Sequence, residues 1–81
     1  MYNIKRERTG RILKANFDHE VSTLESFKTK SEAVAGIKSR RRALEDDMPF
    51  EPTFQDGEDE FTMIVEAQDY NAICRFYIEE E

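Results

Sequence analysis

Side chains able to do chemistry are few and scattered in this 81-residue sequence. His19 is the only histidine and Cys74 the only cysteine, and neither stands at the spacing of a metal site or next to a partner that would activate it. The three glycines make no phosphate-binding loop, and carboxylates are so abundant that any one pair of them carries no information. The sequence therefore predicts no enzyme, no metal site and no cofactor.

Charge is the property that varies most along the chain. Residues 1–44 hold eleven Lys or Arg against five acids, a net of +6, whereas residues 45–81 hold one Arg against thirteen acids, a net of −12. The total of −6 hides this division. Such asymmetry indicates either a charged partner or attraction between the two halves across one small sheet.

A single helix joins the two halves. Thr29 and Glu32 form a Thr-x-x-Glu capping box, which predicts a helix over residues 30–45. Ala33 and Ile37 begin an apolar stripe along one side of it, so the helix should dock on a flat surface. Gly36 lies beside this stripe, where a missing side chain lets a helix approach a sheet closely.

Three consecutive arginines, residues 40–42, lie in the second half of this helix. Arg41 falls by angle inside the apolar stripe, so we expect its stem to lie along the edge of the core. Its charged head should then pair with an acid of the C-terminal hairpin, with Glu66 as one candidate. The acids that follow Leu44 oppose the helix dipole, which predicts that the regular helix ends near residue 45.

Alternating apolar and polar residues flank the helix on both sides. Residues 2–17 are typical of a basic hairpin that turns at Thr9-Gly10, and residues 61–78 of a second hairpin. Residues 18–27 either extend the second strand or form a short third strand, which we favour. Pro49 and Pro52 exclude helix from residues 46–60, an acidic connector. The expected fold class is α+β: a single small domain of residues 1–81 whose antiparallel sheet has four to five strands, in the order β-β-(β)-α-β-β, with one helix packed on one face.

The alternation also divides buried from exposed positions. The expected core is Ile4, Leu13, Phe17, Phe27, Ala33, Ile37, Leu44, Phe61, Met63, Val65, Phe76 and Ile78. Apolar residues are left on the outer sheet face and in the connector, where they are candidates for contact with a partner, including a second copy of the chain: Phe50, Phe54, Ile64, Ile73 and Tyr77.

The junction before the helix reads Ser-Phe-Lys-Thr-Lys-Ser-Glu-Ala-Val-Ala over residues 26–35. Together with the basic hairpin before it, this stretch resembles the strand-to-helix junction of the AP2-like arm-type DNA-binding domains of phage integrases. The resemblance implies a sheet that reads DNA, with Lys5, Arg6, Arg8, Arg11 and Lys14 facing phosphates or base edges. The acidic C-terminal half departs from that family's pattern and would repel DNA.

Two hypotheses about function follow. The first is a non-enzymatic binding protein, a small phage-type regulator or inhibitor, whose acidic half engages a basic surface on a host nucleic-acid-binding or defence protein and so mimics DNA. Its candidate acids are Asp46, Asp47, Glu51, Asp56, Glu58, Asp59, Glu60, Glu66, Glu79 and Glu80. The alternative is a small DNA- or RNA-binding module, with Lys5, Arg6, Arg8, Arg11, Lys14, Arg40, Arg41 and Arg42 as its contacts.

Cellular location is indicated only by what the sequence lacks. The apolar runs are too short to span a bilayer, and charges follow the first five residues where a signal peptide would be apolar. A lone cysteine fits a reducing compartment. We therefore expect a cytoplasmic protein with no membrane partner, and a possible homodimer through the outer sheet face.

Overall fold

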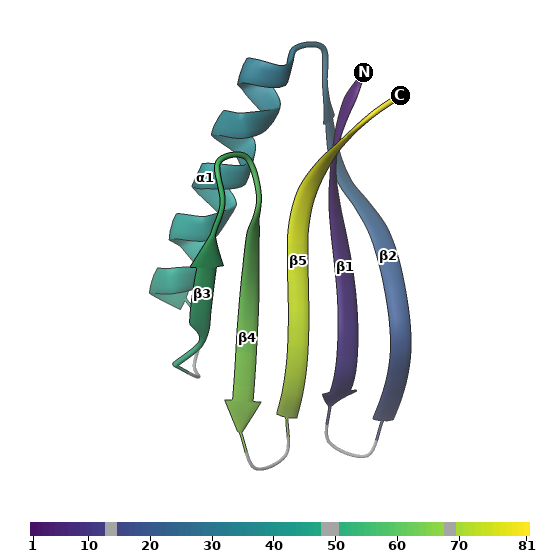
Figure 1. The fold of residues 1–81 in the computed structure, drawn as a ribbon, viewed down its shortest axis with the longest axis vertical. Coiled ribbons are helices and arrows are strands. Elements are labelled where there is room, and N and C mark those ends of the chain that lie inside the picture. The colour runs from purple at the N-terminus through teal and green to yellow at the C-terminus, as the bar shows by residue number, and fades with distance from the viewer. Residues whose placement is uncertain (13–14, 48–50, 68–69) are drawn as a thin grey trace.

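The computed structural model describes the backbone of residues 1–12, 15–47, 51–67 and 70–81, and the side chains of residues 1–10, 19–47, 51–66 and 71–81 (Figure 1). The elements are β1 (Tyr2–Ile12), β2 (Ala15–Phe27), α1 (Lys30–Asp47), β3 (Thr53–Asp56), β4 (Phe61–Ala67) and β5 (Tyr70–Glu80). The five strands form one antiparallel sheet in the order β2-β1-β5-β4-β3, with the helix against one face. The predicted α+β class is confirmed.

The first and last strands form the middle of the sheet. β1 and β5 pair along their whole length, from Tyr2 opposite Glu80 to Ile12 opposite Tyr70. The two ends of the chain therefore lie side by side (Figure 1), and the Glu81 N–H donates to the Met1 carbonyl at 2.9 Å. Each hairpin thus occupies one side of a sheet whose centre is a pairing between distant parts of the sequence.

The helix begins at Lys30, as the capping box predicts. The Glu32 N–H donates to Thr29 Oγ1 at 3.2 Å, and the Thr29 hydroxyl donates to Glu32 Oε1 at 3.0 Å, so the cap fixes the first turn. Gly36 lies against the sheet, where a Cβ would be 2.9 Å from Ile4 Cδ1 and 3.1 Å from the Phe27 ring. This contact confirms the close approach. The helix continues to Asp47, two residues past the expected end.

The core lies between α1 and the inner sheet face. Its buried members among the described side chains are Ile4, Ala33, Ile37, Phe61, Met63, Val65, Ala72, Cys74 and Phe76, and Phe27, Leu44 and Ile78 are half-buried beside them. Phe61 and Phe76 stack at the centre, with ring centroids 4.6 Å apart. The expected core is confirmed wherever its side chains are described, while Leu13 and Phe17 lie outside the described side chains.

Three expectations about the strands were wrong. Residues 18–27 are not a separate strand, because β2 continues to Phe27, and the extra strand is β3, inside the expected acidic connector. β3 pairs with β4 directly after Pro52, which suits an edge strand because proline cannot donate to a neighbour. The expected turn at Thr9-Gly10 is also absent, since both residues belong to β1. Gly10 has a φ of 134° and lies at an irregularity in the β1–β2 pairing.

Candidate functional site

A groove runs between the second half of α1 and the segment that joins β3 to β4. It encloses about 320 Å³. Ile37 and Phe61, both buried, contribute its apolar lining. Its described charged lining has both signs, with carboxylates outnumbering cations: Lys38, Arg41, Arg42, Glu45, Asp56, Glu58 and Glu60. The groove therefore brings acids from three parts of the fold next to one another.

Arg41 is the best-held charge in this groove. Its Nε donates to Asp56 Oδ1 at 2.9 Å and its Nη2 to Asp56 Oδ2 at 3.3 Å, while Nη1 donates to Glu45 Oε2 at 2.8 Å. The guanidinium carbon also lies 3.7 Å from the centre of the Phe54 ring. Hydrogen bonding by Asp56 raises the pKa of Arg41, so its charge is fixed. The predicted pairing of Arg41 within the chain exists, but its acids are Asp56 of β3 and Glu45 of the helix, and neither belongs to the C-terminal hairpin where the partner was expected.

Phe54 forms the support beneath this ion pair. Its ring centroid lies 6.2 Å from that of Phe61, and the residue is half-buried against the core. Phe54 could either cover the open end of the core or be an exposed anchor for a partner, and the structure supports the first, because the connector folds as β3 and turns this side chain toward the helix. Phe50 lies outside the described residues.

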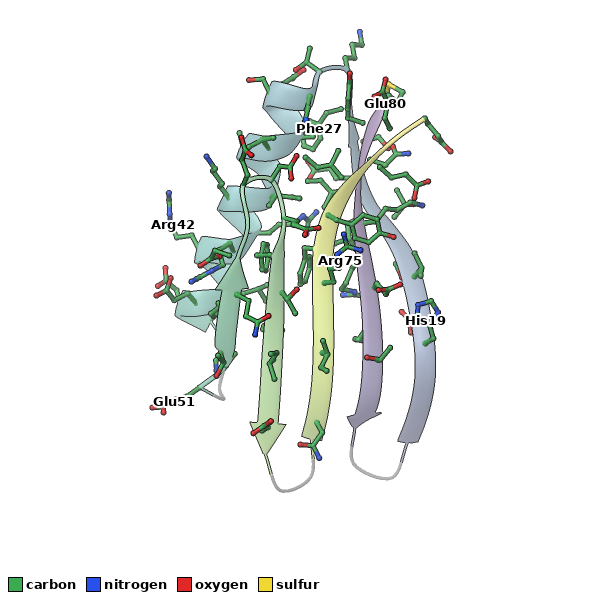
Figure 2. The ribbon with its side chains drawn as sticks, in the orientation of Figure 1. His19, Phe27, Arg42, Glu51, Arg75 and Glu80 are labelled. Atoms are coloured by element: carbon green, nitrogen blue, oxygen red, sulfur yellow. The ribbon has the colours of Figure 1, made fainter. Side chains whose placement is uncertain are left out.

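The ten candidate acids do not form one surface. Asp56, Asp59 and Glu60 are paired with Arg41, with Lys30 at 3.5 Å and with Arg75 at 2.6 Å. The others make no pair within the described part of the chain: Asp46, Asp47, Glu51, Glu58, Glu66, Glu79 and Glu80. Figure 2 shows Glu51 at the lower left, beyond the start of β3, and Glu80 at the opposite end, beside the N-terminus. Free carboxylates therefore occur at both ends of the molecule.

Five carboxylates come from the end of α1 and from the chain on either side of β3. We define the acidic side as Glu45, Asp46, Asp47, Glu51 and Glu58, which come from the end of α1 and from residues on either side of β3. All five are exposed, and only Glu45 has an ion-pair partner among the described residues. The last turn of α1 contains no basic residue that would offset its negative end.

The described basic residues of β1 do not share one face. Strand alternation places Arg6 and Arg8 on the inner face with the helix, whereas Lys5 lies on the outer face. Glu20 pairs with both arginines, at 3.7 Å from Arg6 Nη2 and 3.3 Å from Arg8 Nη2. Lys5 Nζ donates to Thr23 Oγ1 at 2.6 Å.

The arginine run on the helix is divided in the same way. Arg40 Nη2 lies 3.1 Å from Glu25 Oε1 on the β2 side, and Arg41 faces β3. Arg42 points away from the sheet in Figure 2 and makes no ion pair with a described residue. The side chains of Arg11 and Lys14 lie outside the described set. The candidate nucleic-acid contacts thus point in several directions.

Small apolar and paired polar groups cover the outer sheet face. Ile73 is 51% exposed and lies opposite the half-buried Ile64 on β4. Tyr77 is half-buried beneath the guanidinium of Arg75, which lies 4.6 Å from the ring centre. His19 Nε2 lies 2.8 Å from Glu7 Oε2, so the contact of the histidine with a carboxylate on the neighbouring strand explains its position. The exposed apolar patch on this face is small.

The described side chains include no group of three or more His, Cys, Asp or Glu arranged to hold a metal ion. Cys74 is buried, and this burial raises the pKa of its thiol, which makes it a poor nucleophile. No helix in the described ranges is long and apolar enough to cross a bilayer.

Sequence reasoning missed the acids that neutralise the basic half. Glu20 and Glu25 hold three arginines, although neither was a candidate. The Arg41–Glu45 pair could have been predicted from the sequence, because residues four apart on a helix are neighbours. The pairs of Glu20 with Arg6 and Arg8 could not, because the register of β1 against β2 depends on irregularities in their pairing.

Comparison with protein-family models, with curated proteins and with solved structures found no match to this chain.

Proposed function

We propose that this is a non-enzymatic binding protein whose acidic side engages a partner with a basic surface. The observation that carries the proposal is an imbalance in free charge. Seven of the ten candidate acids have no partner within the described part of the chain. On the same basis four cations with described side chains make no ion pair with a described residue: Lys5, which donates only to the Thr23 hydroxyl, Lys28, Lys38 and Arg42. The field that a partner meets is therefore negative, in agreement with the net charge of −6.

The end of α1 supports the same proposal. Asp46 and Asp47 add formal charge to the negative end of the helix dipole, and each such charge is unfavourable there by about 0.3–1 kcal/mol. A cation from a partner would remove this repulsion. An acidic helix end that weakens the free protein is thus suited to binding.

The partner class follows from the chemistry. A surface that attracts exposed carboxylates is rich in Lys and Arg, which is also the composition of a groove that holds a nucleic-acid backbone. The finer proposal is that the protein is a phage-type inhibitor that occupies such a groove on a host nucleic-acid-binding or defence protein, as a DNA mimic. The protein would then compete with nucleic acid for the groove through the positions of its carboxylates and not only through its total charge.

Two variants with the same change in charge test this placement. The first is Asp46→Asn, Asp47→Asn, Glu51→Gln, and the control is Glu66→Gln, Glu79→Gln, Glu80→Gln. The probe is a lysine decapeptide, titrated by calorimetry at about 20 mM and at about 200 mM salt. We expect the first variant to lose at least about fivefold more affinity than the control, because neighbouring carboxylates act on one ligand together. Equal losses in the two variants would overturn the proposal, because net charge alone would then explain binding.

The alternative, a DNA- or RNA-binding module, has a direct test. Duplex DNA is titrated at low and at raised salt with the native chain and with Arg40→Ala, Arg41→Ala, Arg42→Ala. Micromolar binding with a steep salt dependence, lost in the triple variant, would replace the acidic-side proposal with the nucleic-acid one. We expect no binding at low salt, because Arg41 already holds two carboxylates of the chain itself and because Arg40, Arg41 and Arg42 point in different directions.

The outer sheet face is a second candidate surface, for a second copy of the chain. Ile73 is half exposed beside Ile64, and this pair would be covered in a face-to-face dimer. Sedimentation velocity of the native chain and of Ile73→Lys measures the effect. A dimer that the substitution dissociates would support this interface, whereas a monomer at about 0.5 mM would exclude it.

A further inference from the structure

A second hollow lies on the other flank of α1, between its last two turns and the inner sheet face. Arg40, Ala43, Leu44 and Asp47 recur every three to four residues, so they form one stripe that faces this space. In the first half of the helix the corresponding stripe is apolar and buried, through Ala33 and Ile37. The change from apolar to charged residues leaves a gap of about 250 Å³.

We call this gap the arginine pocket and define it by Arg6, Leu24, Arg40, Leu44, Asp47 and Phe76. Phe76 is buried, with 5% of its surface exposed, and Leu24 and Leu44 pack against the same core, so the pocket has an apolar wall. Three charged residues provide the polar part of the lining: Arg6 from a strand, and Arg40 and Asp47 from the helix. An apolar wall with a few convergent polar groups is the usual composition of a small-molecule site.

Both guanidinium groups are short of acceptors. Arg6 Nε and Arg40 Nε are buried without a hydrogen-bond partner. The carboxylate of Glu20 stands 3.7 Å from Arg6 Nη2, too far for a hydrogen bond, and Arg40 has one bond, to Glu25 at 3.1 Å. The side chains remain 30% and 35% exposed while each Nε is buried, so a ligand would meet the terminal Nη groups and not Nε. Each guanidinium has five donors, and a planar carboxylate can accept two of them at once.

We infer that the arginine pocket binds a small monocarboxylate with an aromatic or branched aliphatic body. The carboxylate would accept from Arg6 and Arg40, and the body would lie on Leu24, Leu44 and Phe76. The size suits such a ligand, because an apolar cavity of about 150 Å³ already holds a benzene molecule. This site opens on the flank of α1 that faces β1 and β2, and Asp47 is the one residue that it shares with the acidic side. The two proposals predict opposite effects of Asp47→Asn, a loss of affinity for a cationic peptide and a gain for a carboxylate, so either proposal can fail alone.

Asp47 is a residue of the pocket whose replacement should strengthen ligand binding and not weaken it. It is exposed and lines the pocket without an ion-pair partner among the described residues, so its charge repels an anion placed there. Replacing it with Asn should tighten the binding of a carboxylate by about two- to fivefold. A mutation that strengthens binding is difficult to attribute to general damage to the fold.

Phenylacetate and its neutral isostere phenylacetamide are the probes, titrated into the ¹⁵N-labelled full chain and followed by amide chemical shifts. We expect phenylacetate to bind with a millimolar Kd and to shift the amides of residues 40–47 and of Arg6, Leu24 and Phe76. Phenylacetamide should bind at least about tenfold more weakly, because it carries no charge for the arginines. Equal binding of the two probes, or shifts only outside these residues, would overturn the inference.

Variants then test the assignment of each residue. Arg6→Gln should weaken phenylacetate binding by about tenfold, and Arg42→Gln, which removes the same charge from the solvent side of α1, should leave it unchanged. Asp47→Asn should strengthen it. Should Arg6→Gln fail to fold, Asp47→Asn and the neutral probe still decide, because neither depends on a buried substitution. Weaker binding in Asp47→Asn, or an equal loss in Arg42→Gln, would refute the arginine pocket.

Discussion

We call the contacts of the Arg41 guanidinium with Asp56, Glu45 and Phe54 the Arg41 clamp. The clamp joins α1 to β3, so removing the guanidinium should destabilise the contact between these two elements. Arg41→Met keeps most of the apolar stem and removes the bonds to Asp56 and Glu45 and the stacking on Phe54. The change therefore tests the polar contacts apart from the packing of the stem.

The size of the effect follows from the exposure of the partners. The side chains of Asp56 and Glu45 are 55% and 63% exposed, so water screens both pairs and each is worth about 0.3–0.7 kcal/mol. Stacking of the guanidinium on Phe54 adds about 0.5–1 kcal/mol. We therefore expect Arg41→Met to lower the free energy of unfolding by about 1.5 kcal/mol. With a urea m-value of about 1 kcal/mol/M for a chain of this size, the midpoint should fall by about 1.5 M.

A double-mutant cycle assigns this loss to its contacts. Arg41→Met, Asp56→Asn and the double variant are compared by urea unfolding at about 0.1 M and about 1 M NaCl. The coupling free energy between the two sites should be about 0.5 kcal/mol and should shrink at the higher salt, where the Debye length is about 3 Å. The loss in Arg41→Met that remains at high salt reports the stacking on Phe54. Arg42→Met, at an exposed arginine with no described ion-pair partner, is the control and should change stability by less than about 0.5 kcal/mol.

The reasoning about the clamp would be refuted by a coupling below about 0.2 kcal/mol at low salt. It would also be refuted if Arg41→Met and Arg42→Met had the same effect. Either result would mean that the bidentate geometry does not contribute in solution.

Three further predictions concern the glycines and the buried thiol. Gly10→Ala should cost about 3 kcal/mol or prevent folding, because its positive φ and the backbone of β5 exclude a Cβ. Gly57→Ala should cost less than about 1 kcal/mol by thermal unfolding, because Gly57 has no positive φ and its Cβ would come no closer than 3.2 Å to the Glu60 side chain and carbonyl. Gly36→Leu should cost about 2 kcal/mol or more, since the helix would be pushed off the sheet, while Ala35→Leu on the exposed side should be nearly neutral in urea unfolding. Cys74 has a pKa raised by burial, so the stability that it contributes is complete below the pKa of a free thiol, about 8.5, and is lost as the pH rises through the higher folded value. Unfolding free energies from about pH 8 to about pH 11 should therefore fall more steeply for the native chain than for Cys74→Ala, and equal slopes would contradict this account.

Features of the fold that depend on neighbouring residues were predicted correctly. The start of α1 at Lys30 follows from the Thr29 cap, and the burial of Phe61 and Val65 follows from strict alternation along β4. The close approach at Gly36 follows from its place beside an apolar stripe, because a residue without a side chain lets the helix backbone reach the sheet there. Local signals of this kind act within one element, so the sequence reveals them.

Features that depend on distant pairing were missed. β3 is flanked by proline and acids, which argue against a strand, and it forms because β4 offers an open edge beside the helix. Arg6 and Arg8 are charged, which predicts that they are exposed, yet the alternation along β1 places them on the inner face and Lys5 on the outer face. They are tolerated there because Glu20 on the neighbouring strand pairs with them. The candidate sites failed for the same reason, since charge pairing across strands decides which charges stay free.

The middle of the sheet is a pairing between β1 and β5, and of the five strands β1 is synthesised first and β5 last. Until β5 leaves the ribosome, β1 can pair only with β2, and a two-stranded hairpin is marginally stable at best. α1 would meanwhile lack Phe61 and Phe76, the centre of the core against which it packs. We therefore expect folding to begin only after translation of β5, and to be slow for so short a chain because its central contacts are non-local. During that interval the open edge of β1 is the part of the nascent chain most exposed to aggregation.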